Sequence, residues 1–278
     1  MWYIQVGLPF ITTRFTMLIS FLDIKDDNIL MTFEDPSILS SFEEAQASNP
    51  MLYKHDPSTD RNIYQSHPSF GPLKSFAMEP HLVDFGAAHR MDSPDASTHS
   101  LKLFPIQPRY YRAPEVILGA GWSYPADIWN LGVLAFTLLH NHHLFHHVNT
   151  LDAKYDIKKH LAQMYALLGP VPQHMLQRIN GTCRQKFEPE VENDEGKMCD
   201  TPRDYFGGPY FDEEGHFIEK ELVPKDWTWE GRVRGIDENE REGFLRLARK
   251  MIKWNPEERA TAGELLEDEW LNSNNTVV

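Results

Sequence analysis

The segment ADIWNLGVLAFTLLH, residues 126–140, is apolar almost all round when it is placed on a helix. A helix with this pattern has no face for water, so other elements have to cover it on every side. The segment is too short to span a bilayer and it carries Asp127 and Asn130, which argues against a membrane helix. Pro125 suits the first turn of such a helix. We therefore expect a buried central helix in a helix-rich fold.

Two other stretches also indicate helices. Residues 151–168 look helical and end at Gly169-Pro170. In residues 237–254 the apolar side chains recur at helical spacing on one face. These side chains belong to Phe244, Leu247, Ala248, Met251 and Ile252. Thr261 and Glu264 have the spacing of a capping box, so another helix is expected to begin there.

Strands are indicated only in short runs. Residues 29–31 are apolar and read as a short buried strand, and a second short strand is expected near 81–84. Prolines, glycines and polar residues break up residues 32–80 and 175–235, which we expect to be mostly irregular. The predicted class is therefore mainly α, with a few short strands (α+β).

Size and charge limit the number of domains and the classes of partner that the chain can have. The 278 residues are 41% hydrophobic, which suits one large or two small domains. A net charge of −14 argues against direct nucleic-acid binding, because phosphate contacts need Lys and Arg, and it is compatible with basic peptide partners. Cys183 and Cys199 form neither a metal-spaced motif nor a disulfide framework. A reducing intracellular compartment, cytoplasm or nucleus, is therefore expected.

The first 22 residues, MWYIQVGLPFITTRFTMLISFL, are apolar and contain a single charge, Arg14. A signal peptide would open with a positive region and end at small residues, and this segment has neither feature. Cleavage near residue 22 would also cut directly before an aspartate-rich loop. We expect a buried helix here and no membrane partner; secretion or membrane anchoring is the alternative.

That loop is part of LDIKDDNILM, residues 22–31, where Asp23, Lys25 and Asn28 precede the first apolar run. A polar loop that feeds a buried strand can hold its side chains rigidly at a cleft. Two further motifs follow it in the chain, D-F-G at 84–86 and A-P-E at 113–115.

The order of D-x-K-x-x-N, D-F-G and A-P-E, followed by DIWNLG and WNPEERAT, resembles the C-terminal lobe of a eukaryotic protein kinase. YYRAPEVILGAGWSYPADIWNLGVL and FEDPSIL further resemble fungal relatives of the SR-protein kinases. The resemblance implies a C-lobe at 21–271, which is a helical bundle around the central helix with short strands at the cleft. Within it we expect an insertion at about 32–80 and an activation segment at 84–115. Residues 1–20 would stand in for a supporting helix, and 272–278 would form a tail.

The resemblance also implies roles for the polar residues of the cleft, with ATP and Mg²⁺ as cofactors and the Ser or Thr of a protein as substrate. Asp23 would accept or orient the proton of the substrate hydroxyl, and Lys25 would contact the γ-phosphate. Asn28 and Asp84 would ligate Mg²⁺, which prefers oxygen ligands, and so bind the nucleotide with Lys25. A lysine two residues after the aspartate is typical of serine/threonine kinases. The acidic surface is compatible with an Arg/Ser-rich substrate.

Other residues have structural roles by resemblance. Phe85 and Gly86 complete the D-F-G motif, and Phe85 is expected to pack on Phe21. Glu115 and Arg259 match a buried ion pair that ties the end of the activation segment to the lobe. Asp127 should accept hydrogen bonds from the backbone of the catalytic loop.

The sequence also departs from the family pattern. Phe21-Leu22 replaces His-Arg before the catalytic aspartate, and Asp26 replaces a proline. We interpret Asp26 as a solvated loop charge. Because Leu22 cannot bind phosphate, we expect activity to be independent of activation-loop phosphorylation. The hydroxyls of that loop belong to Ser93, Ser97, Thr98 and Ser100.

The 278 residues contain no G-x-G-x-x-G loop, no V-A-I-K lysine and no matching helix glutamate. We therefore expect half an ATP site and no transfer by this chain alone. Two other functions remain open. One is that of a non-catalytic kinase fragment that acts as an interaction module. The other is that of a metal-binding protein that uses HNHHLFHH at 140–147. In the second case, His142/His146 and His143/His147 would be ligand pairs if this segment were helical.

Overall fold

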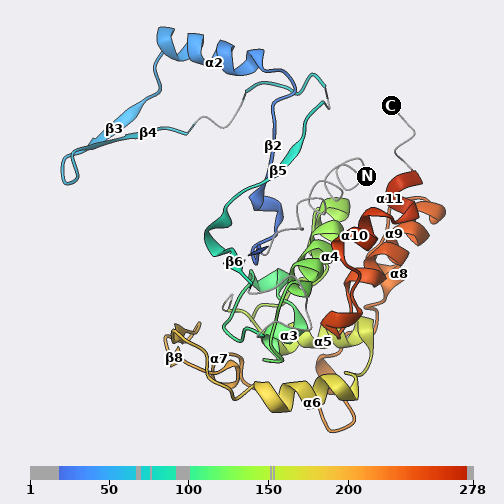
Figure 1. Ribbon diagram of the computed structural model, residues 1–278. Coiled ribbons are helices and arrows are strands. Elements are labelled where there is room, and N and C mark those ends of the chain that lie inside the picture. The colour runs from blue at the N-terminus through green and yellow to red at the C-terminus, as the bar shows by residue number, and fades with distance from the viewer. Residues whose placement is uncertain are drawn as a thin grey trace. The chain divides into compact units, whose positions relative to one another are not determined.

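The computed structural model describes residues 19–66, 70–75, 77–91, 101–150, 152 and 154–273 (Figure 1). Residues 1–18 of the helix expected at 1–20, most of the tail and the hydroxyls of Ser93, Ser97, Thr98 and Ser100 lie outside these residues. The last two residues of the expected helix form a strand, β1 (Ile19–Ser20). The chain forms two compact units, residues 1–29 with 82–278, and residues 30–81.

The elements of the larger unit follow in chain order. They are β1 (Ile19–Ser20), η1 (Asp26–Asn28), η2 (Phe85–Ala87), β6 (His89–Arg90), η4 (Arg109–Tyr111), α3 (Pro114–Ile117), α4 (Pro125–His140), α5 (Ile157–Leu168), α6 (Gln173–Thr182), β7 (Val191–Glu192), β8 (Met198–Cys199), α7 (Pro202–Phe206), η5 (Lys220–Leu222), α8 (Trp229–Arg232), α9 (Glu238–Met251), η6 (Pro256–Glu258), α10 (Ala262–Leu266) and α11 (Glu269–Ser273).

The helix expected at 126–140 is α4, which begins at Pro125 and is buried from Ala126 to Thr137. It contacts α9 and the 3-10 turns η1, η4 and η6 (Figure 1). Asn141 follows its last residue in the left-handed region, with its N–H bonded to the carbonyl of Thr137, and this ends the helix.

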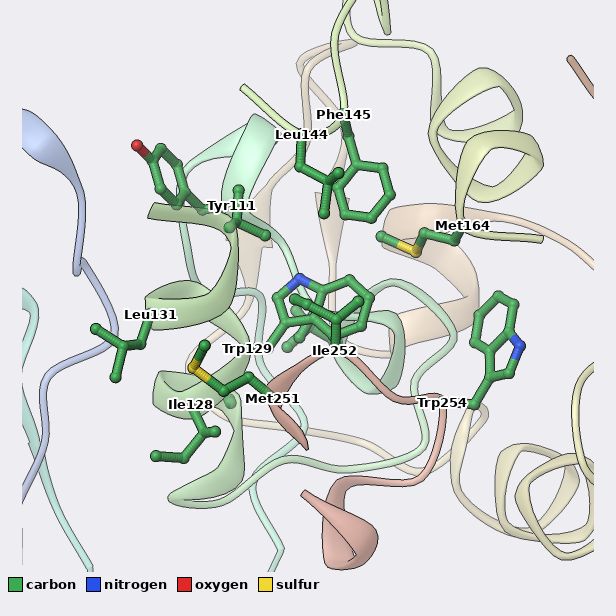
Figure 2. Packing of buried hydrophobic residues seen from close by; sticks show 14 of the residues in the cluster. Tyr111, Ile128, Trp129, Leu131, Leu144, Phe145, Met164, Met251, Ile252 and Trp254 are labelled. Atoms are coloured by element: carbon green, nitrogen blue, oxygen red, sulfur yellow. The ribbon is translucent and has the colours of Figure 1, made fainter. Parts of the chain in front are cut away.

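Aromatic and aliphatic side chains pack around the middle of α4 (Figure 2). Trp129 stacks on Phe145 with ring centroids 5.8 Å apart and an interplanar angle of 6°. Gly132 lets the end of α9 come close, because a Cβ there would lie 2.7 Å from Cδ1 of Ile252. Met251 and Ile252 are both buried against this part of α4, so the helix is covered where the sequence predicted.

The neighbouring helices have recognisable boundaries. Asp156 caps α5 by accepting hydrogen bonds from the N–H groups of Lys158 and Lys159, so this helix begins later than the sequence suggested. It ends before Gly169, whose φ of 73° is left-handed. The capping box expected from Thr261 and Glu264 is present at the start of α10.

The two stretches expected to be mostly irregular also contain short helices and strands that the sequence did not reveal. Residues 175–235 contain most of α6, a β7–β8 hairpin, α7, η5 and α8. Residues 30–81, the smaller unit, contain α2 (Ser37–Ser48) and β3 (Tyr53–Asp56) paired with β4 (Arg61–Tyr64). Pairs of β-strands and short helices with few buried residues carry weak periodicity, so the sequence pattern did not reveal them.

The smaller unit has its own local stabilisation. Asp56 closes the turn of its hairpin by accepting hydrogen bonds from the hydroxyls of Ser58 and Thr59. Phe70 packs on Phe33 and Phe42, with ring centroids 4.8 and 5.4 Å away. The strand runs expected near 29–31 and 81–84 are β2 (Ile29–Met31) and β5 (Pro80–Leu82), which pair with each other. The expectation that 29–31 is buried is wrong, because Leu30 is 57% exposed and its neighbours are half-buried. Among the described residues, no helix has both the length and the apolar character needed to cross a membrane.

His160 of α5 gives the larger unit a pH-dependent stability. Its side chain is fully buried, and Tyr155 hydroxyl and His160 Nδ1 form a hydrogen bond of 2.7 Å. Burial lowers the pKa of His160 to about 3, well below the value of an exposed histidine. Between pH 6.5 and 3 the unfolded chain therefore binds a proton that the folded chain does not, so acidification destabilises the fold.

We expect the free energy of unfolding to fall by about 1.4 kcal/mol more per pH unit, between pH 6 and 4, than it does in His160→Gln. The comparison isolates His160 from other groups. The control is needed because burial raises the pKa of Asp127 to about 6. Between pH 6 and 4 the folded chain therefore binds a proton at Asp127 that the unfolded chain does not, so this group makes acidification stabilising. Urea unfolding at several pH values measures both slopes, and parallel curves would contradict the expectation.

Candidate active site

Asp127 in the first turn of α4 anchors the loop that carries Asp23. Its carboxylate is fully buried and accepts three hydrogen bonds, from the Ser20 hydroxyl at 2.8 Å and from the N–H groups of Phe21 and Leu22 at 2.9 Å each. Burial raises the pKa of Asp127 to about 6, against the lowering effect of these bonds. At neutral pH the carboxylate is therefore ionised and holds the loop backbone, which is the contact expected from the resemblance.

Leu22 turns the chain immediately before Asp23. Its φ of 63° lies in the left-handed region, which is unfavourable for a branched side chain. The bond from its N–H to Asp127 and the burial of its side chain, which is 3% exposed, hold it there. Leu22 stands where the family pattern has an arginine, and it is an apolar, buried anchor at this turn.

Asp23, Lys25 and Asn28 converge on one carboxylate oxygen. Oδ2 of Asp23 accepts from Lys25 Nζ at 3.0 Å and from Asn28 Nδ2 at 2.8 Å. Asn28 Nδ2 also donates to the carbonyl of Asp23 at 2.8 Å, which fixes the orientation of the amide. Its Oδ1 faces away from these donors, and no described residue donates to it. One oxygen of Asn28 is therefore available to a cation, while Asp23 keeps Oδ1 for a hydroxyl.

Asp84 is brought next to Asn28 by backbone pairing. The N–H of Val83 donates to the carbonyl of Asn28 at 2.9 Å, so the D-F-G motif begins one residue after this contact. Asp84 is exposed and left-handed, with φ at 59°, and its Oδ1 accepts from the N–H of Gly86 at 3.3 Å. Carboxylate and amide oxygens on adjoining segments are a donor set that fits Mg²⁺.

Phe85 packs on Phe21, with ring centroids 5.6 Å apart, as expected from the sequence. Strands β1 and β6 pair nearby, with Ser20 opposite His89, so the chain entering the catalytic loop is joined to the chain leaving the D-F-G motif. These two contacts hold the segments that carry Asp23 and Asp84 together.

Glu115 and Arg259 form the buried ion pair that the resemblance implied. Arg259 Nη1 and Nη2 donate to the two carboxylate oxygens at 2.7 and 2.6 Å, and both side chains are 0% exposed. Arg259 also donates to the carbonyls of Pro125 and Lys253 and lies over the ring of Trp129. One guanidinium thus joins α3, the start of α4 and the segment after α9.

Further polar contacts at the cleft were not foreseen. The side-chain amide of Gln107 joins two segments. Its Nε2 donates to Asn130 Oδ1 at 2.6 Å, and its Oε1 accepts from the N–H of Ala113 at 2.7 Å. Asp26 accepts from the hydroxyl of Tyr111 at 3.0 Å, so the interpretation of Asp26 as a purely solvated charge was incomplete. Asn130 inside the apolar helix segment was the one sequence signal of this network.

A cavity of about 370 Å³ opens beside Asp23. Its wall includes Leu22 and Asp23 of the loop, Phe104 and Arg112 from the segment before α3, and Val191 and Tyr205 from the β7–β8 and α7 region. Asp23 therefore lies at the wall of an open cavity. The β7–β8 hairpin, which the sequence did not predict, therefore contributes to the cleft.

The histidines at 140–147 are not arranged as the metal alternative required. The segment after His140 is not helical, so His142/His146 and His143/His147 are not neighbouring turns of a helix. The ring of His143 stacks on Tyr110 with centroids 4.7 Å apart, while its carbonyl oxygen lies 3.2 and 3.3 Å from Nδ1 of His142 and His146. In the described part of the chain, the one group of three ligand-type side chains close enough to share an ion is Asp212, Glu214 and His216, in an exposed turn.

Comparison with known proteins gives a consistent result. The protein kinase domain family matches residues 62–271. A serine/threonine protein kinase of Aspergillus fumigatus is 34% identical over 240 residues, which cover 85% of this chain and 51% of that protein. Human dual specificity protein kinase CLK4 is 30% identical over 195 residues, 67% of this chain and 31% of CLK4.

A plant protein and a solved structure are also similar to this chain. Serine/threonine-protein kinase AFC2 of Arabidopsis thaliana is 31% identical over 160 residues, which cover 57% of this chain and 30% of AFC2. The crystal structure of the PF14_0431 kinase domain has a TM-score of 0.54 and 21% identity, covering 96% of this chain and 65% of that one. It supports the fold alone. The chain spans about half the length, or less, of the curated relatives described here.

Proposed function

Because this chain belongs to the protein kinase domain family, we propose that it supplies the catalytic-loop half of a serine/threonine protein kinase. The observation that carries the proposal is the cluster of Asp23, Lys25 and Asn28 on one carboxylate oxygen, next to the D-F-G segment. In phosphoryl transfer the protein positions reactants and neutralises charge, and these residue types serve both purposes.

The proposed roles follow from the contacts of each side chain. Asp23 orients the substrate hydroxyl and takes its proton through Oδ1, while Lys25 and Asn28 hold Oδ2 in place. Asn28 Oδ1 and the carboxylate of Asp84 would hold Mg²⁺, and Lys25 would contact the γ-phosphate of ATP. Bound Mg²⁺ and ATP supply the transferable phosphoryl group and neutralise its charge.

The domain boundaries are also part of the proposal. Residues 21–271 form the C-terminal lobe, residues 32–80 are an insertion, residues 84–115 form the activation segment, and 1–20 and 272–278 flank the lobe. Support comes from the buried anchor of Asp127 and the Glu115–Arg259 pair, which join the motifs of this lobe into one unit. The substrate is a protein, and the net charge of −14 favours a basic, Arg/Ser-rich segment.

A second candidate function is a non-catalytic interaction module. It is favoured by one observation, that Leu22 stands where the family pattern has an arginine and cannot bind phosphate. The 278 residues hold the catalytic-loop side of the nucleotide, so transfer also requires a lobe with a glycine-rich loop and a lysine on the other side. Loss of orientation alone can remove roughly 7–11 kcal/mol of barrier lowering. The two functions differ in what happens when such a lobe is added.

We expect the 278-residue chain to bind ATP weakly, only with Mg²⁺, and to transfer no label from radiolabelled ATP to a Ser/Arg peptide. Joined to the nucleotide-binding lobe of the Aspergillus fumigatus relative, the same chain should phosphorylate the peptide. A well-folded fusion that binds Mg²⁺–ATP without any transfer would favour the interaction module. Transfer by the 278 residues alone would show that no further lobe is needed.

A further inference from the structure

The histidines that the kinase function does not use form a cluster with Trp227 and Arg232. The rings of His140 and His142 stack with centroids 5.5 Å apart, and His142 lies 5.5 Å from His146. His146 lies in turn 4.8 Å from the ring of Trp227. We call these five residues the His–Arg cluster. It sits between the end of α4 and α8.

Arg232 gives the cluster a positive charge. Its guanidinium lies 4.2 Å from the centroid of Trp227, and its Nη2 is 3.1 Å from Nδ1 of His146. Nδ1 of His146 also lies 3.3 Å from the carbonyl oxygen of His143, so this nitrogen is shared between an acceptor and the guanidinium, which can only donate. A metal cation at His146 would meet the guanidinium directly, so the cluster is unsuited to a metal ion.

Buried nitrogens without a partner are concentrated here. Six buried side-chain atoms lack a hydrogen-bond partner among the described residues, and three of them are His140 Nε2, Trp227 Nε1 and Arg232 Nε. The tryptophan and arginine nitrogens are donors in every protonation state. Such a concentration of donors calls for an acceptor that the chain itself does not provide.

The charged groups that act on His140 and Arg232 are all basic. After burial, the groups that lower the pKa of His140 are His142 and Arg232, and the one that lowers the pKa of Arg232 is Arg234. Among the described residues, no carboxylate forms an ion pair with Arg232 or Arg234. In a chain with a net charge of −14, a half-buried cluster without a counter-charge is an exception.

We propose that the His–Arg cluster binds an oxyanion, and that the ligand class is a phosphate monoester. The guanidinium and the indole and imidazole N–H groups are donors of the kind that bind phosphate oxygens, and a dianion would supply the missing counter-charge. His140 is the last residue of α4, and its Nε2 is one of the three buried nitrogens of the cluster that have no partner among the described residues. The phosphate comes either from a free small molecule or from a phosphorylated serine or threonine side chain.

The indole N–H of Trp227 makes the site directly observable. The chain is labelled with ¹⁵N-tryptophan, and the signal of Trp227 among the seven tryptophans is assigned with Trp227→Phe. Sodium phosphate is then titrated into the full chain by NMR, against sodium chloride at equal ionic strength. We expect a saturable shift of the Trp227 signal with phosphate alone. An equal response to chloride, or no response, would overturn the proposal.

Two variants test the residues. Arg232→Gln should weaken phosphate binding at least tenfold, whereas Arg246→Gln, the same charge change at an exposed position on α9, should leave it unchanged. His142 is exposed, so His142→Gln keeps the fold and should weaken binding even if Arg232→Gln does not fold. Binding unchanged in His142→Gln and in folded Arg232→Gln would refute the site.

The source of the phosphate is resolved by a second ligand, the acetylated tripeptide Gly-phosphoSer-Gly. Binding at least tenfold tighter than that of inorganic phosphate, with none for the unphosphorylated tripeptide, identifies a phosphorylated side chain. Equal affinities identify a free phosphate. None of these measurements depends on phosphoryl transfer, so the result is independent of the proposed kinase function.

Discussion

Replacing Arg259 with Ala should lower the free energy of unfolding by about 3–5 kcal/mol, because the change leaves the fully buried carboxylate of Glu115 without its counter-charge. Two short hydrogen bonds to that carboxylate are lost together with those to the carbonyls of Pro125 and Lys253. Without these bonds α3 is held less firmly to the start of α4. Urea unfolding followed by circular dichroism measures the change.

A double replacement separates the stranded charge from the lost packing. Glu115→Ala with Arg259→Ala should destabilise less than Arg259→Ala alone, since no unpaired charge stays buried. Arg249→Ala is the matched control, because Arg249 also pairs with a carboxylate, that of Glu230, and lies over a tryptophan ring, but is 46% exposed. It should cost no more than about 1 kcal/mol. If Arg259→Ala unfolds at the wild-type midpoint, the pair does not stabilise the fold.

Replacing Asp23 with Asn should lower the rate of phosphoryl transfer by roughly 10²–10⁴-fold, the usual contribution of a positioned proton acceptor. The enzyme for this measurement is the chain joined to the nucleotide-binding lobe of the Aspergillus fumigatus relative. Asparagine has the shape of aspartate, and its Oδ1 can still accept from Lys25 and Asn28, so the loop should keep its structure. The loss should therefore appear in kcat, with nucleotide binding little changed.

Asp27→Asn is the control for this variant. Asp27 is exposed in the same loop and its replacement removes the same charge, so the rate should change little. A large and equal loss in both variants would mean that the general charge of the loop matters and that Asp23 has no special role. An unchanged rate in Asp23→Asn would remove Asp23 from the mechanism altogether.

Local features of the fold could be predicted where the sequence carries a strong period or a cap. The apolar segment became α4, the amphipathic one became α9, and Thr261 with Glu264 formed the capping box. The predictions failed where elements are short or exposed. In α2 no residue is buried, so the apolar period that reveals a surface helix is absent.

The sequence by itself determined which chemical groups are available and in what order, because motifs such as D-x-K-x-x-N and D-F-G are contiguous. It also determined the helix pattern, since backbone hydrogen bonds and burial periods are local. It left open how each group is held. Asp27 and Asp127 are both aspartates in the sequence, yet one is exposed and the other is fully buried.

Only the tertiary structure decided which distant residues meet. Asp127 receives the N–H of Leu22 from 105 positions away, and this contact holds Leu22 in a left-handed turn that no local preference favours. Arg232 contacts His146, which lies 86 positions earlier in the chain, and its positive charge makes this histidine segment unsuited to a metal ion. Such contacts depend on how helices pack, and packing is set by the shapes of many side chains together, which no single stretch of sequence contains.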